Sequence, residues 1–309
     1  MLPIHFAPLQ GYTDAAYRNA HCAAFGGIEA YYTPFWRIER GEIRRKDIAD
    51  YSNDTTGRVI PQIIVRDAAE FCLLVEQLRQ LGARHIDINM GCPFPMQTNK
   101  GRGAGLLERT KQVGEILKEV SHSSDIDFSI KMRLGNQSGE EFRALLPMLN
   151  ETPLTHITVH PRIGKQQYKG AVDMDRFGEF LAQCNHSVIY NGDLTSVDDI
   201  KRIERDFPDV KGIMLGRGLL SRPSLAAEYH SGEELEESAL KRGIMDMHRE
   251  IFAYYSATLQ GEAQILSKIK AFWEYLEPTI GHKAHKAIHK AGNLHKYTAA
   301  VDGMRYENL

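Results

Sequence analysis

The sequence predicts an α/β fold, a (β/α)8 TIM barrel followed by a small C-terminal all-helical domain. Short apolar runs alternate with helical patterns, which is typical of a parallel sheet covered by helices. Eight such units fit into about 220 residues, the spacing of a closed barrel. Beyond Pro223 the apolar residues recur only at helical spacing. We therefore expect the barrel to span residues 1–232 and the helical domain residues 233–309.

Each strand is predicted from a short apolar run that ends in polar or small residues. The expected strands cover residues 4–9, 29–35, 59–65, 85–89, 128–133, 156–160, 187–191 and 212–216. Helices are expected at residues 15–25, 67–81, 104–120, 138–149, 173–183 and 196–207. The charged segment 37–50 fits either a helix or a loop. A doubly wound sheet is the structural alternative, but no G-x-G-x-x-G turn follows the first strand.

Composition excludes several classes of protein. The formal net charge is −2, so any binding of nucleic acid has to come from a local basic patch. The four cysteines form no C-x-x-C pair, which argues against a structural metal or a disulfide framework and favours a reducing cytosol. The first residues lack a signal-peptide pattern, and no apolar run reaches the ~18–20 residues of a membrane span. We expect a cytoplasmic protein that does not bind membranes.

The active site of such a barrel lies at the C-terminal ends of its strands. Polar or reactive residues occupy these ends in this chain: Asn89 with Cys92, Lys131 with Arg133, His160 with Arg162, Asn191 with Asp193, and Gly216 with Arg217. A lone cysteine is more often a core residue than a catalytic one. Here, however, it follows a strand in a turn fixed by Gly91 and Pro93. No carboxylate pair for glycoside hydrolysis and no G-x-S-x-G elbow is present, which leaves the thiol as the candidate for proton transfer or nucleophilic attack.

Two glycine-containing turns end the last two strands, Asn191-Gly192-Asp193 and Gly216-Arg217-Gly218. Barrels commonly bind phosphate at this place through backbone N–H groups. A phosphate-bearing cofactor is therefore expected. Lys131 suits a ligand that accumulates negative charge, such as a reduced flavin, and Gln62 and His160 offer further hydrogen bonds.

Six motifs, in order, resemble those of the dihydrouridine synthases. They are Ala7-Pro8-Leu9-Gln10-Gly11-Tyr12-Thr13-Asp14, Asn89-Met90-Gly91-Cys92-Pro93, Lys131-Met132-Arg133-Leu134-Gly135, His160-Pro161-Arg162 with Gln166 and Tyr168, Asn191-Gly192-Asp193, and Gly216-Arg217-Gly218. The likeness covers residues 4 to about 225, and the helical tail fits the family's second domain.

The resemblance implies an FMN-dependent enzyme that reduces a uracil in tRNA with NADPH or NADH, with hydride passing from FMN N5 to uracil C6. Cys92 would protonate C5 as general acid. The flavin would be backed by Ala7, Pro8 and Leu9, and hydrogen-bonded by Gln62, Lys131 and His160. Asn191, Gly192, Asp193, Gly216 and Arg217 would hold the ribityl chain and phosphate. Asn89 and Arg162 would position the uracil. We expect a monomer without a metal.

Between Gly281 and Ala300 the tail carries lysines and histidines but no acidic residue. We call Lys283, Lys286 and Lys290 the basic ridge and expect it to contact RNA phosphates, against the alternative of a solvated helix face. His285 and His289 have the spacing of metal ligands, but no third ligand is evident.

Two departures from the family pattern concern the substrate. Pro95 and Met96 stand where the family commonly carries lysine, and Met174 stands where it often has tryptophan. They leave open which uridine is modified and whether the RNA is tRNA or rRNA. The alternatives are a flavin barrel that acts on a small molecule, such as an enone or dihydroorotate, and an RNA-binding scaffold without chemistry. The retained Cys92, Lys131 and His160 argue against the scaffold.

Overall fold

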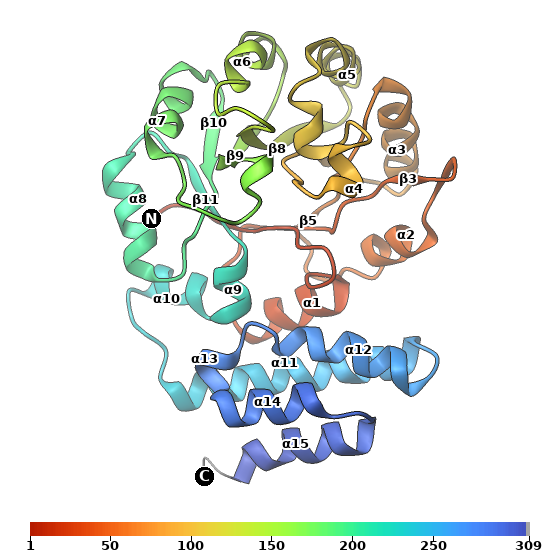
Figure 1. Cartoon of the computed structure of the whole chain (residues 1–309), viewed down its shortest axis with the longest axis vertical. Coiled ribbons are helices and arrows are strands. Elements are labelled where there is room, and N and C mark those ends of the chain that lie inside the picture. The colour runs from red at the N-terminus through yellow and green to blue at the C-terminus, as the bar shows by residue number, and fades with distance from the viewer. Residues whose placement is uncertain (307–309) are drawn as a thin grey trace.

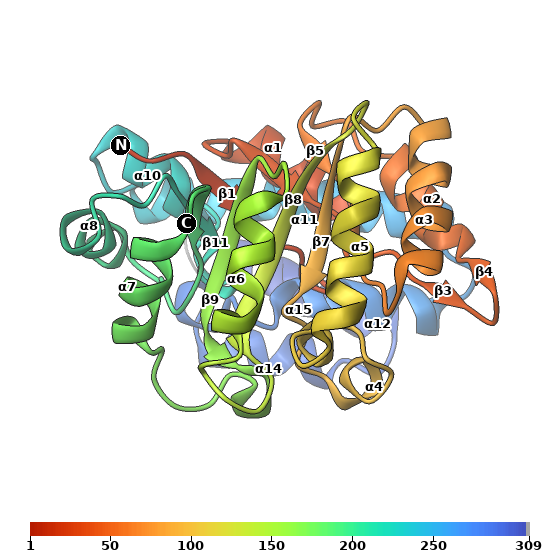
Figure 2. The same cartoon turned by 90° about the horizontal axis from the view of Figure 1, so that it is seen from above.

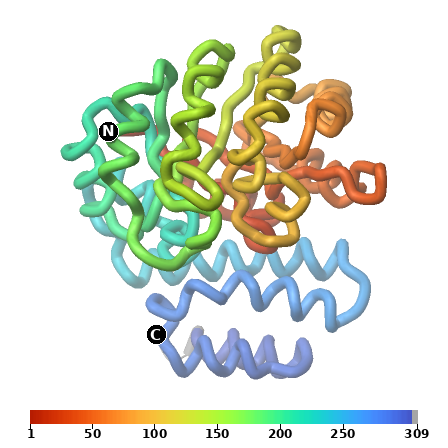
Figure 3. Tube along the Cα trace, turned by 45° about the horizontal axis from the view of Figure 1, so that its top comes forward, coloured from red at the N-terminus to blue at the C-terminus, as the bar shows by residue number. Residues whose placement is uncertain are grey.

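The structure is a computed structural model of the chain, and it describes residues 1–306. A barrel of parallel strands lies above a layer of helices formed by the C-terminal residues (Figure 1). Figure 3 shows this layer continuing along one side of the barrel. The fold is therefore the predicted barrel followed by helices.

All pairings in the main sheet are parallel, and its strands follow one another around the barrel. Their order is β5 (Val59–Ile60), β2 (Ala30–Tyr32), β1 (Ile4–Phe6), β11 (Gly212–Leu215), β10 (Ser187–Tyr190), β9 (His156–Ile163), β8 (Asp127–Gly135), β7 (His85–Met90) and β6 (Gln62–Ile63). The expected strand 59–65 is split into β5 and β6 at Pro61, which has no N–H to donate. The Pro61 carbonyl still accepts from Asp87 N at 2.9 Å, so the split strand closes the ring.

Helices cover the outside of the barrel, and Figure 2 shows four of them, α3, α5, α6 and α7, side by side. The covering helices are α1 (Ala15–Ala24), α3 (Ala68–Gln80), α5 (Thr110–His122), α6 (Phe142–Glu151), α7 (Met174–Gln183) and α8 (Val197–Asp206). The side chains of Asp14, Asp67, Asp173 and Ser196 cap four of them by accepting from backbone N–H groups. These boundaries agree with the sequence pattern to within a few residues.

One connection differs from the prediction, and the structure defines another that the sequence left open. The expected helix 104–120 is a short 3-10 turn, η1 (Gly103–Leu106), followed by α5, and it is preceded by the short α4 (Pro95–Thr98). The open segment 37–50 contains a hairpin of β3 (Ile38–Glu39) and β4 (Glu42–Ile43), and then α2 (Arg45–Ser52). The break in the expected helix lies at Arg109, whose φ of −118° and ψ of 63° are outside the helical region, so a continuous helix from residue 104 cannot form.

Side chains along the barrel strands alternate between the outside and the inside of the sheet. Outward residues such as Ile86 and Ile88 join the large core beneath the helices. Inside the barrel, one apolar cluster consists of Ala7, Ala30, Tyr32, Ile60, Ile189 and Met214. The inward positions of β7, β8 and β9 are polar instead: Asp87, Asn89, Ser129, Lys131, Arg133, Thr158 and His160.

The C-terminal helices pack against α1 of the barrel. They are α11 (Glu237–Thr258), α12 (Glu262–Trp273), α13 (Glu277–Ile280), α14 (His282–Lys290) and α15 (Leu294–Tyr306), preceded by α9 (Arg217–Ser221) and α10 (Leu225–Ser231). Asp14, the cap of α1, accepts hydrogen bonds from Tyr255 Oη at 2.8 Å and Lys268 Nζ at 3.2 Å. Gly243 allows close contact with Phe25, because a Cβ there would lie 2.5 Å from the phenyl ring. Within residues 1–306, no helix has both the length and the apolar character that a bilayer crossing requires.

Candidate active site

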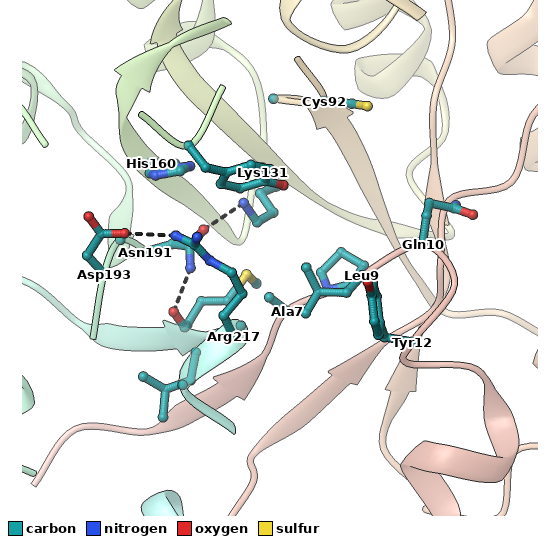
Figure 4. A pocket seen from close by; sticks show the side chains of 18 of the residues that line it. Ala7, Leu9, Gln10, Tyr12, Cys92, Lys131, His160, Asn191, Asp193 and Arg217 are labelled. Carbon is teal, nitrogen blue, oxygen red and sulfur yellow. Dashed lines mark hydrogen bonds and ion pairs between the residues drawn. The ribbon is translucent and has the colours of Figure 1, made fainter. Parts of the chain in front are cut away.

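A cavity of about 590 Å³ opens at the C-terminal ends of the barrel strands (Figure 4). Its walls come from the ends of β1, β7, β8, β9, β10 and β11, and from Tyr275 after α12. Twelve of the residues predicted for the site line it: Ala7, Pro8, Leu9, Asn89, Cys92, Lys131, His160, Asn191, Gly192, Asp193, Gly216 and Arg217. Residues from six different strands therefore converge at one place, as the barrel rule requires.

The turn that carries Cys92 is held by backbone hydrogen bonds. Asn89 Oδ1 accepts from the N–H groups of Gly91 at 3.0 Å and Cys92 at 2.8 Å. The Cys92 carbonyl accepts from Ala104 N at 3.0 Å, so the glycine-rich loop folds back onto the cysteine. Gly103 makes this approach possible, because a Cβ there would lie 2.6 Å from the Cys92 carbonyl oxygen. The thiol is thus fixed by contacts on both sides of the turn.

The Cys92 side chain is a protonated thiol at neutral pH. Its residue is only 8% exposed, and burial raises the pKa of the thiol above its usual value. The nearby cations Arg133 and Lys131 oppose this shift but do not overcome it. A neutral thiol at a cavity wall is suited to donate a proton rather than to attack as a thiolate.

Lys131 lies in the barrel interior and is fixed by Asn191. Its Nζ donates to Asn191 Oδ1 at 2.8 Å, and Asn191 Nδ2 donates to the Met214 carbonyl at 2.7 Å. Burial, and then the charge of Arg133, lower the pKa of Lys131 to about 8. The ammonium therefore remains mostly charged at pH 7 and is directed at the cavity.

His160 is neutral, and its contacts define its tautomer. Arg162 Nη1 lies 3.3 Å from His160 Nε2. A guanidinium can only donate, so Nε2 accepts and Nδ1 carries the hydrogen. Burial, and then the charge of Arg133, hold the pKa of His160 well below its ordinary value. The imidazole is thus a neutral hydrogen-bond donor at the cavity wall.

Two arginines flank the ring of Tyr168. The guanidinium carbon of Arg217 lies 4.7 Å from the ring centroid, and that of Arg133 lies 5.5 Å from it. Arg133 is held in place because its Nε donates to the Gly91 carbonyl at 2.9 Å. The sequence analysis placed Arg133 at a strand end without assigning it a role, and it named Tyr168 only as part of a motif. Arg133 could have been assigned to the site from the sequence, because alternation along β8 places it on the same face of the sheet as Lys131.

The two glycine-containing turns, residues 191–193 and 216–218, pack against each other. Asp193, with φ of +44°, accepts hydrogen bonds from the guanidiniums of Arg162 and Arg217. The hydrogen bond from Arg162, followed by its charge, lowers the pKa of Asp193. Gly218 lets the second turn approach the first, since a Cβ there would lie 2.1 Å from the Leu194 carbonyl oxygen. The turns thus form one cradle rimmed by arginines.

Five predicted site residues lie outside the cavity lining. Gln62 is fully buried behind Asn89, whose Nδ2 donates to Gln62 Oε1 at 2.7 Å. Arg162 is 2% exposed and touches the site through His160 and Asp193. The three lysines of the basic ridge are exposed on α14.

The basic ridge occupies one short helix rather than a long face of the tail. Helix α14 ends at Lys290, and residues Ala291–Asn293 separate it from α15. Lys270 Nζ donates to the carbonyls of His289 and Ala291 and so closes the C-terminal end of α14. Figures 1 and 2 place α14 on the side of the molecule where the barrel strands end.

The helical layer reaches the cavity through an aromatic pair. Tyr12, from the loop after β1, and Tyr275 both line the cavity and meet edge to face at 5.4 Å. Tyr12 Oη also donates to Glu274 Oε2 at 2.8 Å. Sequence reasoning did not find Tyr275, because nothing in the tail pattern indicates which helix end meets the barrel. Within residues 1–306, no group of three or more His, Cys, Asp or Glu side chains is arranged so that it could hold a metal ion.

Comparisons with known proteins agree with this geometry. The family model described as dihydrouridine synthase (Dus) matches residues 5–300. The tRNA-dihydrouridine synthase B of Pasteurella multocida is 28% identical over 247 residues, which cover 78% of this chain and 73% of that protein. The tRNA-dihydrouridine(16) synthase of Aquipseudomonas alcaligenes is 29% identical over 256 residues, covering 76% and 78%.

Among solved structures, morphinone reductase in complex with tetrahydroNAD superimposes with a TM-score of 0.52 at 10% identity, covering 77% of this chain and 89% of that one. This likeness concerns the barrel fold. The family model, by contrast, extends over the motifs at the strand ends and over the helical layer. The chain therefore belongs to the dihydrouridine synthase family of flavin-dependent oxidoreductases.

Proposed function

We propose that this protein is an FMN-dependent tRNA-dihydrouridine synthase that reduces the C5=C6 bond of a uridine with NADPH or NADH. The observation that carries the proposal is a buried, protonated Cys92 facing the cavity that Lys131, His160 and the two glycine-containing turns also line. Figure 4 shows Cys92 on one side of this space and Ala7 and Leu9 on the other. A planar cofactor and a planar base can lie between these two walls.

The residues present fit FMN. Ala7, Pro8 and Leu9 offer an apolar backing, and Lys131 offers a cation held at 2.8 Å from Asn191. His160 offers a neutral N–H, and the cradle of Asn191 to Asp193 with Gly216 and Arg217 suits a ribityl chain and a phosphate. When bound, FMN supplies the hydride that reduces the ring.

The proton for uracil C5 comes from the thiol of Cys92. Burial keeps this thiol protonated at pH 7, and the hydrogen bonds from Gly91 and Cys92 N–H to Asn89 fix its turn. Arg133 stands near the sulfur and stabilises negative charge that remains there after the transfer. Solvent protons then restore the thiol.

The substrate is proposed to be a uridine that has left its base stack, because the cavity lies inside a barrel rim. Asn89 lines the wall next to Cys92, and Arg162 orients His160 and Asp193 around the same space. The exposed lysines of the basic ridge lie on the side of the molecule where the strands end. They are placed to contact phosphates of the RNA whose base enters the cavity.

The decisive experiment compares the wild type with Cys92→Ala. The variant should keep the flavin absorbance and lose dihydrouridine formation on unmodified tRNA by about 10²–10⁴-fold, since general-acid catalysis is lost. Mass spectrometry of the RNA measures the product, and the RNA that gains two hydrogens distinguishes tRNA from rRNA. Cys72→Ala, on the exposed face of α3, is the matched control and should retain full activity. Full activity of Cys92→Ala would reject the general-acid role.

The basic ridge is tested by charge reversal. Lys283→Glu, Lys286→Glu and Lys290→Glu together should weaken tRNA binding by at least about tenfold at low salt and flatten its salt dependence. Flavin binding should not change. Reversal of Lys111, Lys118 and Lys201, three exposed lysines of the barrel helices α5 and α8, is the matched control. Equal RNA affinity of the two triple variants would show that the ridge does not contact RNA.

A further inference from the structure

Large apolar side chains are exposed mainly around the mouth of the cavity. Within residues 1–306, the exposed large hydrophobic residues are Met1, Leu73, Phe94, Met96 and Tyr168. Phe94 and Tyr168 line the cavity, and Met96 follows Phe94 by two residues. Together with the exposed Pro95 between them, Phe94 and Met96 form three consecutive exposed apolar residues, which we call the apolar run. Such a run is unfavourable in water and is unusual on a protein surface unless it serves binding.

The loop that carries the apolar run is anchored to the barrel. Arg102, which is 5% exposed, donates from Nε to Glu70 Oε2 at 3.0 Å and from Nη2 to the Ile38 carbonyl at 3.1 Å. Gly105 lets the loop fold onto α4, since a Cβ there would lie 2.5 Å from the Thr98 carbonyl oxygen. The apolar side chains are therefore exposed although their backbone is fixed, so little backbone entropy is lost when a partner covers them.

The chemistry around the apolar run favours a nucleic acid over a protein as its partner. Residues 91–107 contain no acidic residue, and the exposed Lys100 lies in the same loop. Figure 2 shows α4 on the side of the molecule where α14 with the basic ridge lies and where the barrel strands end. Apolar and cationic side chains next to each other match the faces of bases and the phosphates that join them.

The position of Phe94 relates it to the base that neighbours the one in the cavity. Cys92 and Phe94 are two residues apart, and two residues of chain span at most about 7 Å. A base that leaves its stack for the cavity deprives its neighbours of a stacking partner, and this loss opposes flipping. Phe, Met and Pro are among the side chains that proteins insert between bases where a stack has been opened.

We propose that the apolar run is a wedge that stacks on the base adjacent to the flipped uridine, with Phe94 as the stacking ring and Met96 beside it. The proposal rests on the function proposed above in taking RNA as the substrate, but it concerns binding and not the transfer of hydride or proton. It also gives a role to Pro95 and Met96, two positions at which this chain departs from the family pattern. Phe94 thereby helps to determine which uridine enters the cavity.

The test measures stacking on the neighbouring base rather than turnover. The probe is a fluorescein-labelled RNA hairpin whose loop holds a single uridine between adenosines. Two further RNAs carry an abasic nucleotide in place of the adenosine on the 5′ side or on the 3′ side of the uridine. Fluorescence anisotropy at low salt gives the affinity of each protein for each RNA. All proteins are reconstituted with FMN and compared at equal flavin absorbance.

We expect the wild type to bind the parent RNA about tenfold more tightly than one of the two abasic RNAs, because one base–aromatic stack is lost. Phe94→Ala should bind the parent RNA about tenfold more weakly than the wild type and should no longer distinguish the abasic RNA. Phe94→Trp should keep both properties, and Met96→Ala should weaken binding by a smaller factor of about three, since Met96 has no ring. Leu73→Ala, which removes a comparably exposed apolar side chain from α3, is the matched control and should bind as the wild type does.

Loss of cofactor or general damage weakens the binding of all three RNAs alike, so only contact with the neighbouring base removes the discrimination. Circular dichroism establishes the folding of each variant. The proposal is overturned if the wild type does not distinguish the RNAs, or if folded Phe94→Ala still does. Equal affinity of Phe94→Ala and the wild type for the parent RNA also overturns it and leaves the apolar run to a protein partner.

The wedge and the proposed function fail separately. If the wild type forms no dihydrouridine in tRNA but discriminates between the RNAs through Phe94, the proposed function fails and the wedge stands. If the wild type forms dihydrouridine and Phe94→Ala binds all three RNAs as the wild type does, the wedge fails and the proposed function stands.

Discussion

The two sides of the barrel interior differ although the same strand geometry builds both. The side formed by β1, β2, β5, β10 and β11 is closed by the apolar cluster of small and branched residues around Tyr32. The side formed by β7, β8 and β9 carries carboxylate, amide, ammonium and guanidinium groups at its inward positions. Outward residues of both sides join the same large core. The difference between the sides is therefore confined to the inward positions.

This difference separates stability from chemistry. Burying apolar groups stabilises the fold, whereas burying polar groups costs free energy unless each has a partner. The polar side offsets much of that cost through paired groups, as in the contacts of Asp87 with Ser129 and Gln62 and of Lys131 with Asn191. Thr158 Oγ1 on β9 is an exception, because it is buried without a hydrogen-bond partner among the described residues. The same burial shifts the pKa of Lys131 down to about 8 and that of Asp87 up to about 6. The apolar side offers a rigid wall against which these groups are held.

The largest effect is expected on the polar side. Lys131→Met should lower turnover on tRNA by about 10²–10³-fold, because it removes the buried cation at the place where negative charge develops. The unfolding free energy should change little, because the lost desolvation cost of the ammonium is offset by the loss of the donor to Asn191 Oδ1. Steady-state kinetics and urea unfolding measure both. Undiminished turnover would mean that the polar side does not serve the reaction.

On the apolar side we expect a substitution to lower the unfolding free energy and to leave turnover unchanged. Ile189 is 3% exposed and does not line the candidate active site. Ile189→Ala leaves a cavity at this buried position, so it should lower the unfolding free energy by about 3 kcal/mol. Turnover per folded molecule should stay unchanged. Ile189→Val is the graded control, with an expected loss of about 1 kcal/mol. A selective loss of turnover in either variant would contradict the separation.

The last prediction concerns the far end of the interior, where the ring centroid of His156 lies 5.6 Å from that of His5 and 5.6 Å from that of His85. Burial is the main cause that lowers their pKa values to about 4, 4 and 3. Below pH 6.5 the unfolded chain therefore takes up protons that the folded chain refuses. Stability should fall as pH drops from 6.5 towards 4, by up to about 1.4 kcal/mol per histidine and pH unit.

Thermal unfolding between pH 7 and pH 4.5 measures this loss. The His156→Gln variant sharpens the test, because removing one of the three groups should reduce their joint contribution to the pH dependence by about a third. An unchanged slope in that variant would assign the acid sensitivity to other groups, such as His21 and His160, whose pKa values are also lowered. Retention of the wild-type melting temperature at pH 4.5 would show that the three imidazoles accept protons in the folded chain.

The sequence was sufficient for the barrel, because strand ends and helix caps are local signals. Runs such as 85–89 and 128–133 alternate clearly, and Asp67 and Asp173 are recognisable caps. The break at Pro61 was also readable in principle, since proline cannot donate to a sheet. The split of the predicted helix 104–120 was missed because its first turn, η1, is held by a hydrogen bond from Ala104 N to the Cys92 carbonyl, a contact that helical periodicity does not reveal.

The cavity was predictable only where a motif or a strand end marked it. Lys131, His160 and Asn191 stand in motifs towards the C-terminal ends of their strands and were found, whereas Tyr275 enters from the turn after α12, which has no such mark. The hydrogen bonds of Asp87 with Ser129 and Gln62 also escaped prediction. In the sequence, a carboxylate at an inward strand position cannot be distinguished from an ordinary polar residue until its neighbours are known. Contacts between side chains of different strands depend on strand register and on closure of the barrel, and the periodicity of a single strand reveals neither.

The aromatic pair of Tyr12 and Tyr275 has a consequence for how the molecule can be divided. Together with the bonds that join Asp14 to Tyr255 and Lys268, it makes the helical layer part of the candidate active-site cavity and of the cap of α1. A truncated chain ending near residue 232 would lose Tyr275 from the rim of this cavity and expose the face of α1 that packs against α11. The two folding units are thus not autonomous modules, and only the intact chain presents a complete entrance.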